Sequence, residues 1–273
     1  GRWATSGGGA LQLPAAVRGA VRADPGWRLV VADAAQLEPR VLAALAGDTA
    51  MAAAGRRGDL YAGVVEAGAV ATREEAKYAM LGAIYGATTG AGAALMPRLT
   101  RAYPRAVGLV EDAARSGERG DVVTTWLGRT SPAPGPSWHA AVEAASAEGA
   151  GPQETREAQR RRRDRGRFTR NFVVQGTAAE WALCWMAALR RMLLDLPSGH
   201  APGAPAAPGR GDRPHLVFFL HDEVVVHTPA SVADDVAAAV RAAAAEAGRL
   251  LFGAFPVDFA LDVAVVESYD QAG

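Results

Sequence analysis

Two apolar stretches far apart in the chain constrain its fold, because each is suited to a buried strand and each leads into carboxylates. The first stretch ends at Val30-Val-Ala-Asp33. The second, Phe218 to His227, contains two apolar strands around a polar turn that includes Asp222 and Glu223. We therefore expect the strand and the hairpin to meet in one sheet, with the three carboxylates at one edge.

Carboxylates so close together are costly unless a hard cation neutralises them. Two Mg²⁺ ions between Asp33 and Asp222 would clamp the attacking and leaving oxygens of a phosphoryl transfer. Taken alone, either aspartate is more often a turn former or a helix cap. The metal site therefore depends on the two segments meeting.

The only lysine of the chain, Lys77, lies in a series of residues spaced by four: Arg73, Lys77, Leu81 and Tyr85. On a helix these residues share one face, here called the nucleotide stripe, which is cationic at its start and aromatic at its end. A nucleoside triphosphate has the same layout, and an ammonium can approach one phosphate without imposing a fork geometry. A surface helix with two scattered cations and a core tyrosine would give the same spacing.

Composition limits the class of protein. With 273 residues, 49% of them hydrophobic, the chain can build a large core or two subdomains. Cys184 is the sole cysteine, so neither a disulfide within the chain nor a cysteine zinc site is expected. We expect no membrane span and recognise no signal segment, which favours a cytosolic protein. The net charge of zero is weak for a free-standing duplex binder, because duplex affinity depends largely on phosphate neutralisation.

Local patterns divide the rest of the chain. The glycine-rich run 86–92 lacks the Gly-Lys-Ser/Thr of a phosphate loop and indicates a helix end and turn. The charge run 160–165 suits either a solvated face or a contact with a DNA backbone. The segment 175–196 predicts an amphipathic helix, 197–214 a flexible insertion, and 257–266 a closing strand.

Taken in order, these segments resemble the polymerase domain of family A DNA polymerases. Asp33 to Arg40 is similar to that family's first catalytic motif, usually Asp-Tyr-Ser-Gln-Ile-Glu-Leu-Arg. The stretch Arg73 to Gly86 resembles its nucleotide-binding fingers helix, Arg-x3-Lys-x3-Phe-Gly-x2-Tyr-Gly, and 220–227 resembles its His-Asp-Glu motif. Shorter resemblances lie at 1–2, 11–14, 123–129 and 167–179, so the likeness covers nearly the whole chain.

The resemblance implies an α+β fold: an antiparallel palm sheet backed by helices, with a mostly helical fingers subdomain. Residues 1–55 would form the first part of the palm, 56–165 the fingers and 166–273 the second part of the palm. Because the chain starts inside a family motif, we expect it to be the C-terminal part of a longer polymerase or exonuclease-polymerase, with the thumb absent from this chain. We also expect a monomer in the bacterial cytosol or nucleoid.

The activity implied by the resemblance is template-directed DNA synthesis, in which a primer 3′-hydroxyl attacks the α-phosphate of a deoxynucleoside triphosphate. Asp33 and Asp222 would hold two Mg²⁺ ions, or Mn²⁺, and the carbonyl of Ala34 would add a ligand. Glu223 would support the metals or the primer end through water. Lys77 would protonate the departing pyrophosphate.

The resemblance also assigns substrate contacts. The nucleotide would meet Arg73 and Lys77 at its phosphates, Tyr85 at the nascent base pair and Glu38 under the sugar, with Gln36 and Leu81 completing the site. Tyr85 would move when the fingers close. The minor groove of the primer-template, where all base pairs share acceptors, would be contacted by Arg2, Gln12, Arg167, Asn171, Gln175 and His221.

Some residues depart from the family pattern. Ala34-Ala35 replaces the usual Tyr-Ser, Pro39 a leucine, Leu81 an aromatic residue and Tyr61 a histidine that meets a phosphate. None of these removes a metal ligand, and together they indicate a divergent branch. A non-catalytic DNA-binding relative, or a metal-dependent nuclease or phosphohydrolase using the same carboxylates, remains an alternative. Metal-dependent primer extension and nucleotide retention by the fingers would distinguish them.

Overall fold

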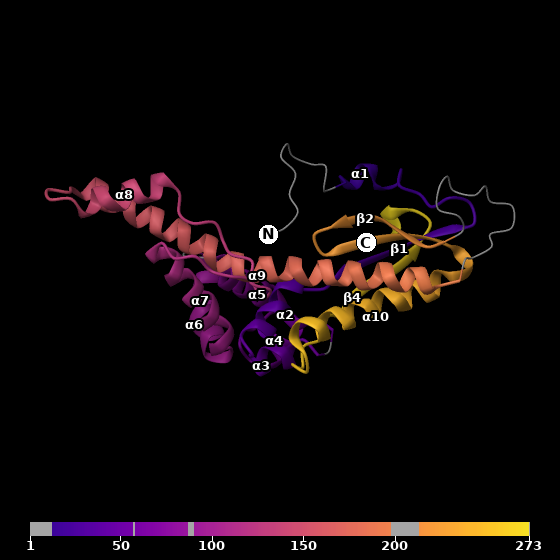
Figure 1. The fold of residues 1–273 in the computed structure, drawn as a ribbon. Helices are drawn as coiled ribbons and strands as arrows, with labels where there is room; N and C mark the ends of the chain where they lie inside the picture. The colour runs from indigo at the N-terminus through magenta and orange to yellow at the C-terminus, as the bar shows by residue number, and fades with distance from the viewer. Residues whose placement is uncertain (1–12, 57, 87–89, 198–212, 273) are drawn as a thin grey trace. The chain divides into compact units, whose positions relative to one another are not determined.

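The computed structural model describes residues 13–56, 58–86, 90–197 and 213–272 (Figure 1). By their internal contacts, the described residues form two compact units. The first unit contains residues 38–178 and 255–257, and the second contains the remaining described residues, from 13–37, 179–254 and 258–272. The assignment of palm and fingers to particular ranges stays a prediction.

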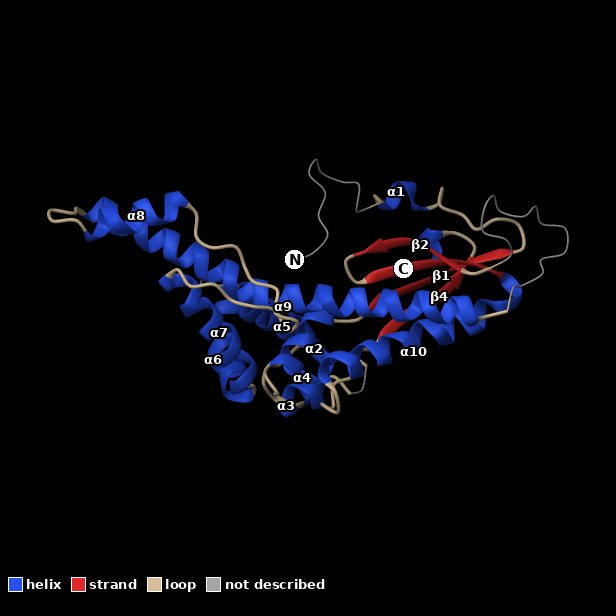
Figure 2. Ribbon diagram, in the orientation of Figure 1, coloured by secondary structure: helices blue, strands red, loops and turns tan. Residues whose placement is uncertain are grey.

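The second unit is built on a four-stranded antiparallel sheet (Figure 2). Its strand order is β2-β3-β1-β4, from β1 (Trp27–Ala34), β2 (His215–Leu220), β3 (Glu223–Pro229) and β4 (Leu261–Val266). The expected strand before Asp33 and the expected hairpin are both present, and they pair directly. The closing strand is shorter than expected and starts at Leu261, because its partner strand β1 ends opposite, at Ala34.

Strand β1 is buried on both faces, which explains its continuous apolar sequence. Leu29 and Val31 point to one face, where they form a cluster with Val225 and Tyr269. Val30 and Ala32 point to the other face and are also fully buried. Helix α10 (Ala233–Phe252) contacts β1, β3 and β4. The α+β expectation of an antiparallel sheet backed by helices is confirmed.

The predicted helix 175–196 is the C-terminal half of one 44-residue helix, α9 (Pro152–Asp195), which also contains the charge run. Within the second unit, the Nε1–H of Trp185 donates to the carbonyl of Val240 on α10 at 3.0 Å, and Trp181 stacks on Phe259. Contrary to our expectation, one window of α9 is long and apolar enough to cross a membrane, by length and composition. Because 61% of that window is buried in the protein, a core helix accounts for the same composition.

The first unit is helical. It contains nearly all of α2 (Leu37–Leu45), α3 (Thr49–Ala54), α4 (Leu60–Glu66), α5 (Arg73–Tyr85), α6 (Gly90–Ala102), α7 (Pro104–Arg119), α8 (Pro136–Ser146) and the first part of α9. Shorter elements of the second unit are α1 (Ala15–Arg18), η1 (Ala230–Val232) and η2 (Tyr269–Ala272).

Side-chain caps fix where several of these helices begin. Asp48 caps α3 by accepting from the N–H of Met51, and it also accepts from the N–H of Ala106 in α7, which joins the two helices. Thr72 caps α5 in the same way. Helix α5 ends at Gly86, whose φ of 74° is the left-handed conformation that glycine adopts without strain.

Helices α7 and α9 pack closely at two glycines. A Cβ on Gly117 would lie 2.1 Å from Oγ1 of Thr169 and 2.8 Å from the carbonyl oxygen of Arg165. A Cβ on Gly166 would lie 3.0 Å from the carbonyl oxygen of Ala114. Thr169 donates from Oγ1 to the carbonyl of Ala113 at 2.7 Å across this contact. The two helices can therefore approach this closely only because both positions are glycine and carry no side chain.

We expect Gly117→Ala to lower the free energy of unfolding by about 1–3 kcal/mol, because the added methyl group forces the two helices apart. Gly108→Ala on the same helix is the control, since a Cβ there meets nothing within 4 Å. It should stabilise the protein by up to about 1 kcal/mol, as alanine is the better helix former. Urea unfolding of both variants measures the difference, and equal effects would contradict the packing argument.

Candidate active site

The candidate residues form two groups, one in each unit. The second unit contains the carboxylates with Ala34, Gln36 and His221, and the first contains the nucleotide stripe with Glu38 and the α9 residues. Arg2 and Gln12 lie outside the described residues.

The carboxylate edge is formed where β1 ends beside the β2–β3 turn. Asp33 is the register partner of Glu223 on β3 and of Asp262 on β4. The N–H of Ala34 donates to the carbonyl of Asp222 at 2.9 Å, which holds the hairpin turn against the end of β1. The backbone alone therefore brings Asp33, Asp222 and Glu223 together, as the sequence predicted.

Two residues beside this edge adopt a left-handed backbone. Gln36 has a φ of 49° and His221 a φ of 55°, values that non-glycine residues rarely adopt. Each such residue costs of order 1 kcal/mol and persists where its surroundings fix it. Nδ1 of His221 is also buried, with no hydrogen-bond partner among the described residues. The turns that present the carboxylates are thus held in an unfavourable conformation.

The edge is electrostatically unfavourable when all its carboxylates are charged. Burial, and then the charges of Asp222, Glu223 and Asp262, raise the pKa of Asp33 to about 7. A cation bound at this edge would favour the charged carboxylates and would lower the pKa of Asp33 again. The oxygen donors present are those that Mg²⁺ prefers, so the residues fit a hard divalent ion.

Two residues of the carboxylate edge were missed by sequence reasoning. Asp262 is the second residue of the closing strand, and its only sequence signal is an acidic residue in an apolar, alternating segment. The hydroxyl of Tyr269 donates to the Glu223 carboxylate, and burial together with that carboxylate raises the pKa of Tyr269 to about 12. The guanidinium of Arg18 lies 5.1 Å from the centre of the Tyr269 ring. Tyr269 therefore orients Glu223.

The nucleotide stripe lies on helix α5, which spans Arg73–Tyr85 as predicted. The opposite face is buried and consists mainly of Ala76, Ala79, Met80, Ala83 and Ile84. Lys77 is exposed and makes no hydrogen bond or ion pair within the part of the chain that the structure describes. Tyr85 is 37% exposed, so it is not the core tyrosine of the alternative interpretation.

Arg73 is held by its neighbours in the first unit. Its Nε forms an ion pair with Oδ2 of Asp59 at 2.6 Å, and its guanidinium lies 5.6 Å from the centre of the buried Tyr61 ring. Asp59 also caps α4 by accepting from two backbone N–H groups. The single hydrogen bond through Nε leaves the guanidinium's other N–H groups to meet a phosphate.

A hydrogen-bonded chain joins three of the predicted residues. Nε2 of Gln175 donates to the Tyr85 hydroxyl at 2.9 Å, and that hydroxyl donates to Oε1 of Glu38 at 3.2 Å. These side chains come from α9, α5 and α2. Sequence reasoning placed Gln175 with the primer-template and the other two with the nucleotide, and it did not foresee that they would bond to each other.

The other two α9 candidates precede Gln175 by four and eight residues. Arg167 forms an ion pair with Asp164, and its side chain packs beside Gly86 at the end of α5. Oδ1 of Asn171 is buried without a hydrogen-bond partner in the described residues. Arg167, Asn171 and Gln175 therefore share one helix face, as the four-residue spacing predicts.

No group of three or more His, Cys, Asp or Glu side chains among the described residues is arranged to hold a metal by itself.

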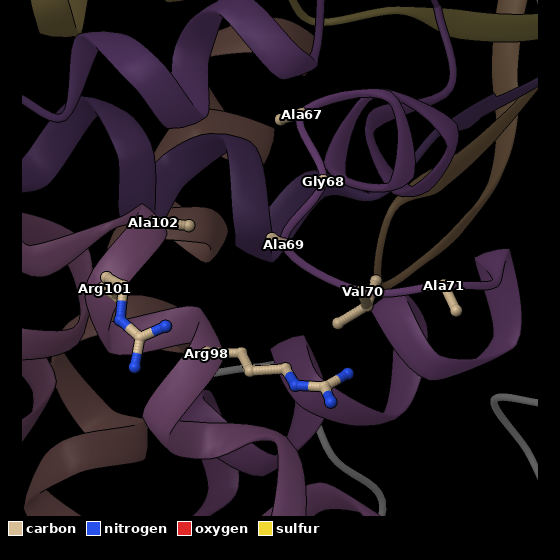
Figure 3. Close-up of a pocket in the computed structure, with 8 residues that line it drawn as sticks. All are labelled: Ala67, Gly68, Ala69, Val70, Ala71, Arg98, Arg101 and Ala102. Atoms are coloured by element: carbon tan, nitrogen blue, oxygen red, sulfur yellow. The ribbon is translucent and has the colours of Figure 1, made fainter.

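The first unit also has a cavity of about 530 Å³, lined by residues 67–71 and, from α6, Arg98, Arg101 and Ala102 (Figure 3). The cavity contains none of the candidate residues.

We expect Asp33→Asn to raise the unfolding temperature at pH 8 in EDTA. A carboxyl whose pKa is raised on folding favours the folded state only while it keeps its proton, so the wild type loses stability as the pH rises from about 4 through about 7. Asparagine carries no charge, so the difference between the two proteins should vanish below pH 4. Thermal melts across this range test it, with the exposed Asp195→Asn as control. A pH-independent difference would contradict the repulsion.

Three comparisons with known proteins bear on this arrangement. The family model described as DNA polymerase family A matches residues 11–271. DNA polymerase I of Chloroflexus aurantiacus is 28% identical over 245 residues, which cover 82% of this chain and 22% of that protein. The chain thus spans about a fifth of that relative's length.

A similar fold occurs in a solved structure, the POL domain of Pol1 from M. smegmatis in complex with DNA primer-template and dNTP. The TM-score is 0.67 at 20% sequence identity, and the match covers 94% of this chain and 43% of the other. The likeness extends through both units. Since the family model matches nearly the whole sequence, the chain belongs to DNA polymerase family A.

Proposed function

We propose that this chain carries the nucleotidyl-transfer site of a template-directed DNA polymerase that extends a primer with deoxynucleoside triphosphates. The observation that carries the proposal is the carboxylate edge. There, Asp33 and Asp222 are brought together by the backbone, and the pKa of Asp33 is raised to about 7. Family membership and the nucleotide stripe support it. The neighbour from M. smegmatis binds primer-template and dNTP, by its title, and we extend these ligands to this chain.

We assign the metal site to Asp33 and Asp222, with the main-chain oxygen of Ala34 as a further ligand. Two Mg²⁺ ions bound there would supply positive charge for the attacking and leaving oxygens. Glu223, oriented by Tyr269, would hold a water molecule or the primer end. Asp262 faces Asp33 across the β1–β4 pair and adds negative charge to the same site. The number and identity of the ions belong to this proposal.

The first unit would bind the nucleotide through its stripe. Arg73 and Lys77 would neutralise the β- and γ-phosphates, and Nζ of Lys77 would give its proton to the departing pyrophosphate. Tyr85 would flank the new base pair after its hydroxyl leaves Gln175. Glu38 would then face the sugar and exclude a 2′-hydroxyl. Leu81 offers the sugar an aliphatic surface where family members usually have an aromatic ring.

We expect Asp222→Asn to reduce primer extension by several orders of magnitude, because it removes a charge that the divalent ions need. The measurement is single-turnover extension of a labelled primer with excess protein, template, dNTP and Mg²⁺. Asp195→Asn is the control and should extend at the wild-type rate. The fold should survive in both, as melting temperatures would show. Near-normal extension by Asp222→Asn would refute the assignment of the metal site.

We expect Lys77→Arg to lower turnover about 100-fold while changing the apparent nucleotide affinity much less. Arginine keeps the charge but does not release a proton at neutral pH, and general acids typically contribute 10²-fold or more. Tyr78→Phe, on the same helix but off the stripe, is the control. If the arginine variant matched the wild type in turnover, Lys77 would act only as a counter-charge.

A further inference from the structure

A groove lined by arginines lies between three helices of the first unit and contains none of the residues assigned above. It has a volume of about 620 Å³. Helix α7 contributes Arg115, Glu118 and Arg119, α8 contributes Trp138, and α9 contributes Arg162 and Arg163. Figure 1 shows α8 running beside the N-terminal part of α9. We call this the arginine groove.

Close contacts join the three helices around the arginine groove. Helices α7 and α9 touch at Gly117 and Gly166, and the lining residues of the groove lie next to these contacts in both helices. The Trp138 ring packs on Gly120 so tightly that a Cβ there would lie 2.7 Å from the ring. The guanidinium of Arg161 donates to Oγ of Ser137 at 3.3 Å and ties α9 to the start of α8.

The lining of the groove is strongly cationic. Four guanidinium groups face one carboxylate, that of Glu118. Arg115 and Arg119 pair with Asp112 and Asp121, but these pairs are solvent-exposed and therefore weak. A ligand of higher charge can displace such partners.

The two α9 arginines and the tryptophan have unused donors. Arg162 and Arg163 make no hydrogen bond or ion pair within the described residues. The Nε1–H of Trp138 also lacks an acceptor within the same residues, but it is buried and is therefore closed to a ligand in the groove. An oxygen-rich anion in the groove would meet the guanidinium groups instead, use their free donors and neutralise their charge.

We propose that the arginine groove binds the phosphate backbone of a nucleic-acid strand, as a contact separate from the nucleotidyl-transfer site. Arginine forks match phosphate oxygens, and four guanidinium groups from two helices suit successive phosphates better than one small anion. The choice of nucleic acid as the polyanion rests on the proposed function, which brings DNA to this protein. Of the two interpretations of the charge run 160–165, the groove favours the backbone contact.

The test compares two double variants of the full chain that lose the same charge. Arg162→Gln with Arg163→Gln alters the groove. Arg98→Gln with Arg101→Gln, in the cavity of Figure 3, is the matched control, since those arginines are also exposed and lack ion pairs within the described residues. Fluorescence anisotropy measures binding of a labelled single-stranded oligonucleotide from 50 mM to 1 M salt, without dNTP or Mg²⁺.

We expect the groove variant to bind at least about tenfold more weakly at 50 mM salt. Its plot of log affinity against log salt should be shallower by about 1.4, because each lost phosphate contact on a single strand removes about 0.7 from the slope. The control should stay within about twofold of the wild type. Melting temperatures of all three proteins should agree.

The proposal would be overturned if the groove variant lost no affinity for the oligonucleotide, or if both variants lost affinity equally. Competition by inorganic pyrophosphate at micromolar concentration would also overturn it and would indicate a small-anion site. Competition by poly-glutamate as strong as that of the oligonucleotide would overturn it and would indicate an acidic protein partner. Primer extension is measured separately, and the groove variant should keep the wild-type turnover at saturating primer-template. A wild type that binds through the groove but extends no primer would refute the proposed function alone.

Discussion

The position of β1 between two antiparallel neighbours is the constraint on which the candidate active site depends. Because β3 and β4 run opposite to β1, the end of β1 lies beside the beginnings of both. Asp33 therefore faces Glu223 and Asp262 without any contribution from side-chain packing. The hydrogen bond from Ala34 to Asp222 adds the hairpin turn to the same edge. Apolar residues on both faces of β1 keep the strand in place, and the sheet opposes the repulsion among the carboxylates.

Much of this arrangement could be predicted because short sequence patterns determine its individual elements. The apolar run before Asp33, the polar turn in the hairpin and the four-residue spacing of the stripe each specify an element within one segment. Helix α5 contains the whole predicted stripe and ends at Gly86, where the glycine-rich run indicated a helix end. The position of Asp33 and Asp222 at one edge followed from assuming that the two segments share a sheet.

The parts that could not be predicted depend on register and side-chain direction between distant segments. Asp262 joins the edge only because β4 pairs with β1 in a particular register. Tyr269 reaches Glu223 from beyond the last strand, and Gln175 reaches Tyr85 across 90 positions of sequence. The length of α9 was also missed, because its first half is too polar to show the pattern of a buried helix. Charge alone could not decide whether the run 160–165 is a solvated face or a contact with a DNA backbone. The structure adds that Arg162 and Arg163 line a groove together with residues of α7 and α8.

The order of strands in the sheet has a consequence for how the chain folds. Asp33 and Glu223 are 190 positions apart, yet they are register partners in adjacent strands. Closing so large a loop costs chain entropy before any ladder hydrogen bond compensates it, and proteins rich in such distant pairings fold slowly. During synthesis β1 (Trp27–Ala34) leaves the ribosome well before β3 and β4, so it remains without either neighbour until residues 223–266 follow. Until then its apolar run and unpaired edges expose it to aggregation. The helices between β1 and β3 can fold during this time, but the carboxylates come together only when β3 and β4 pair with β1.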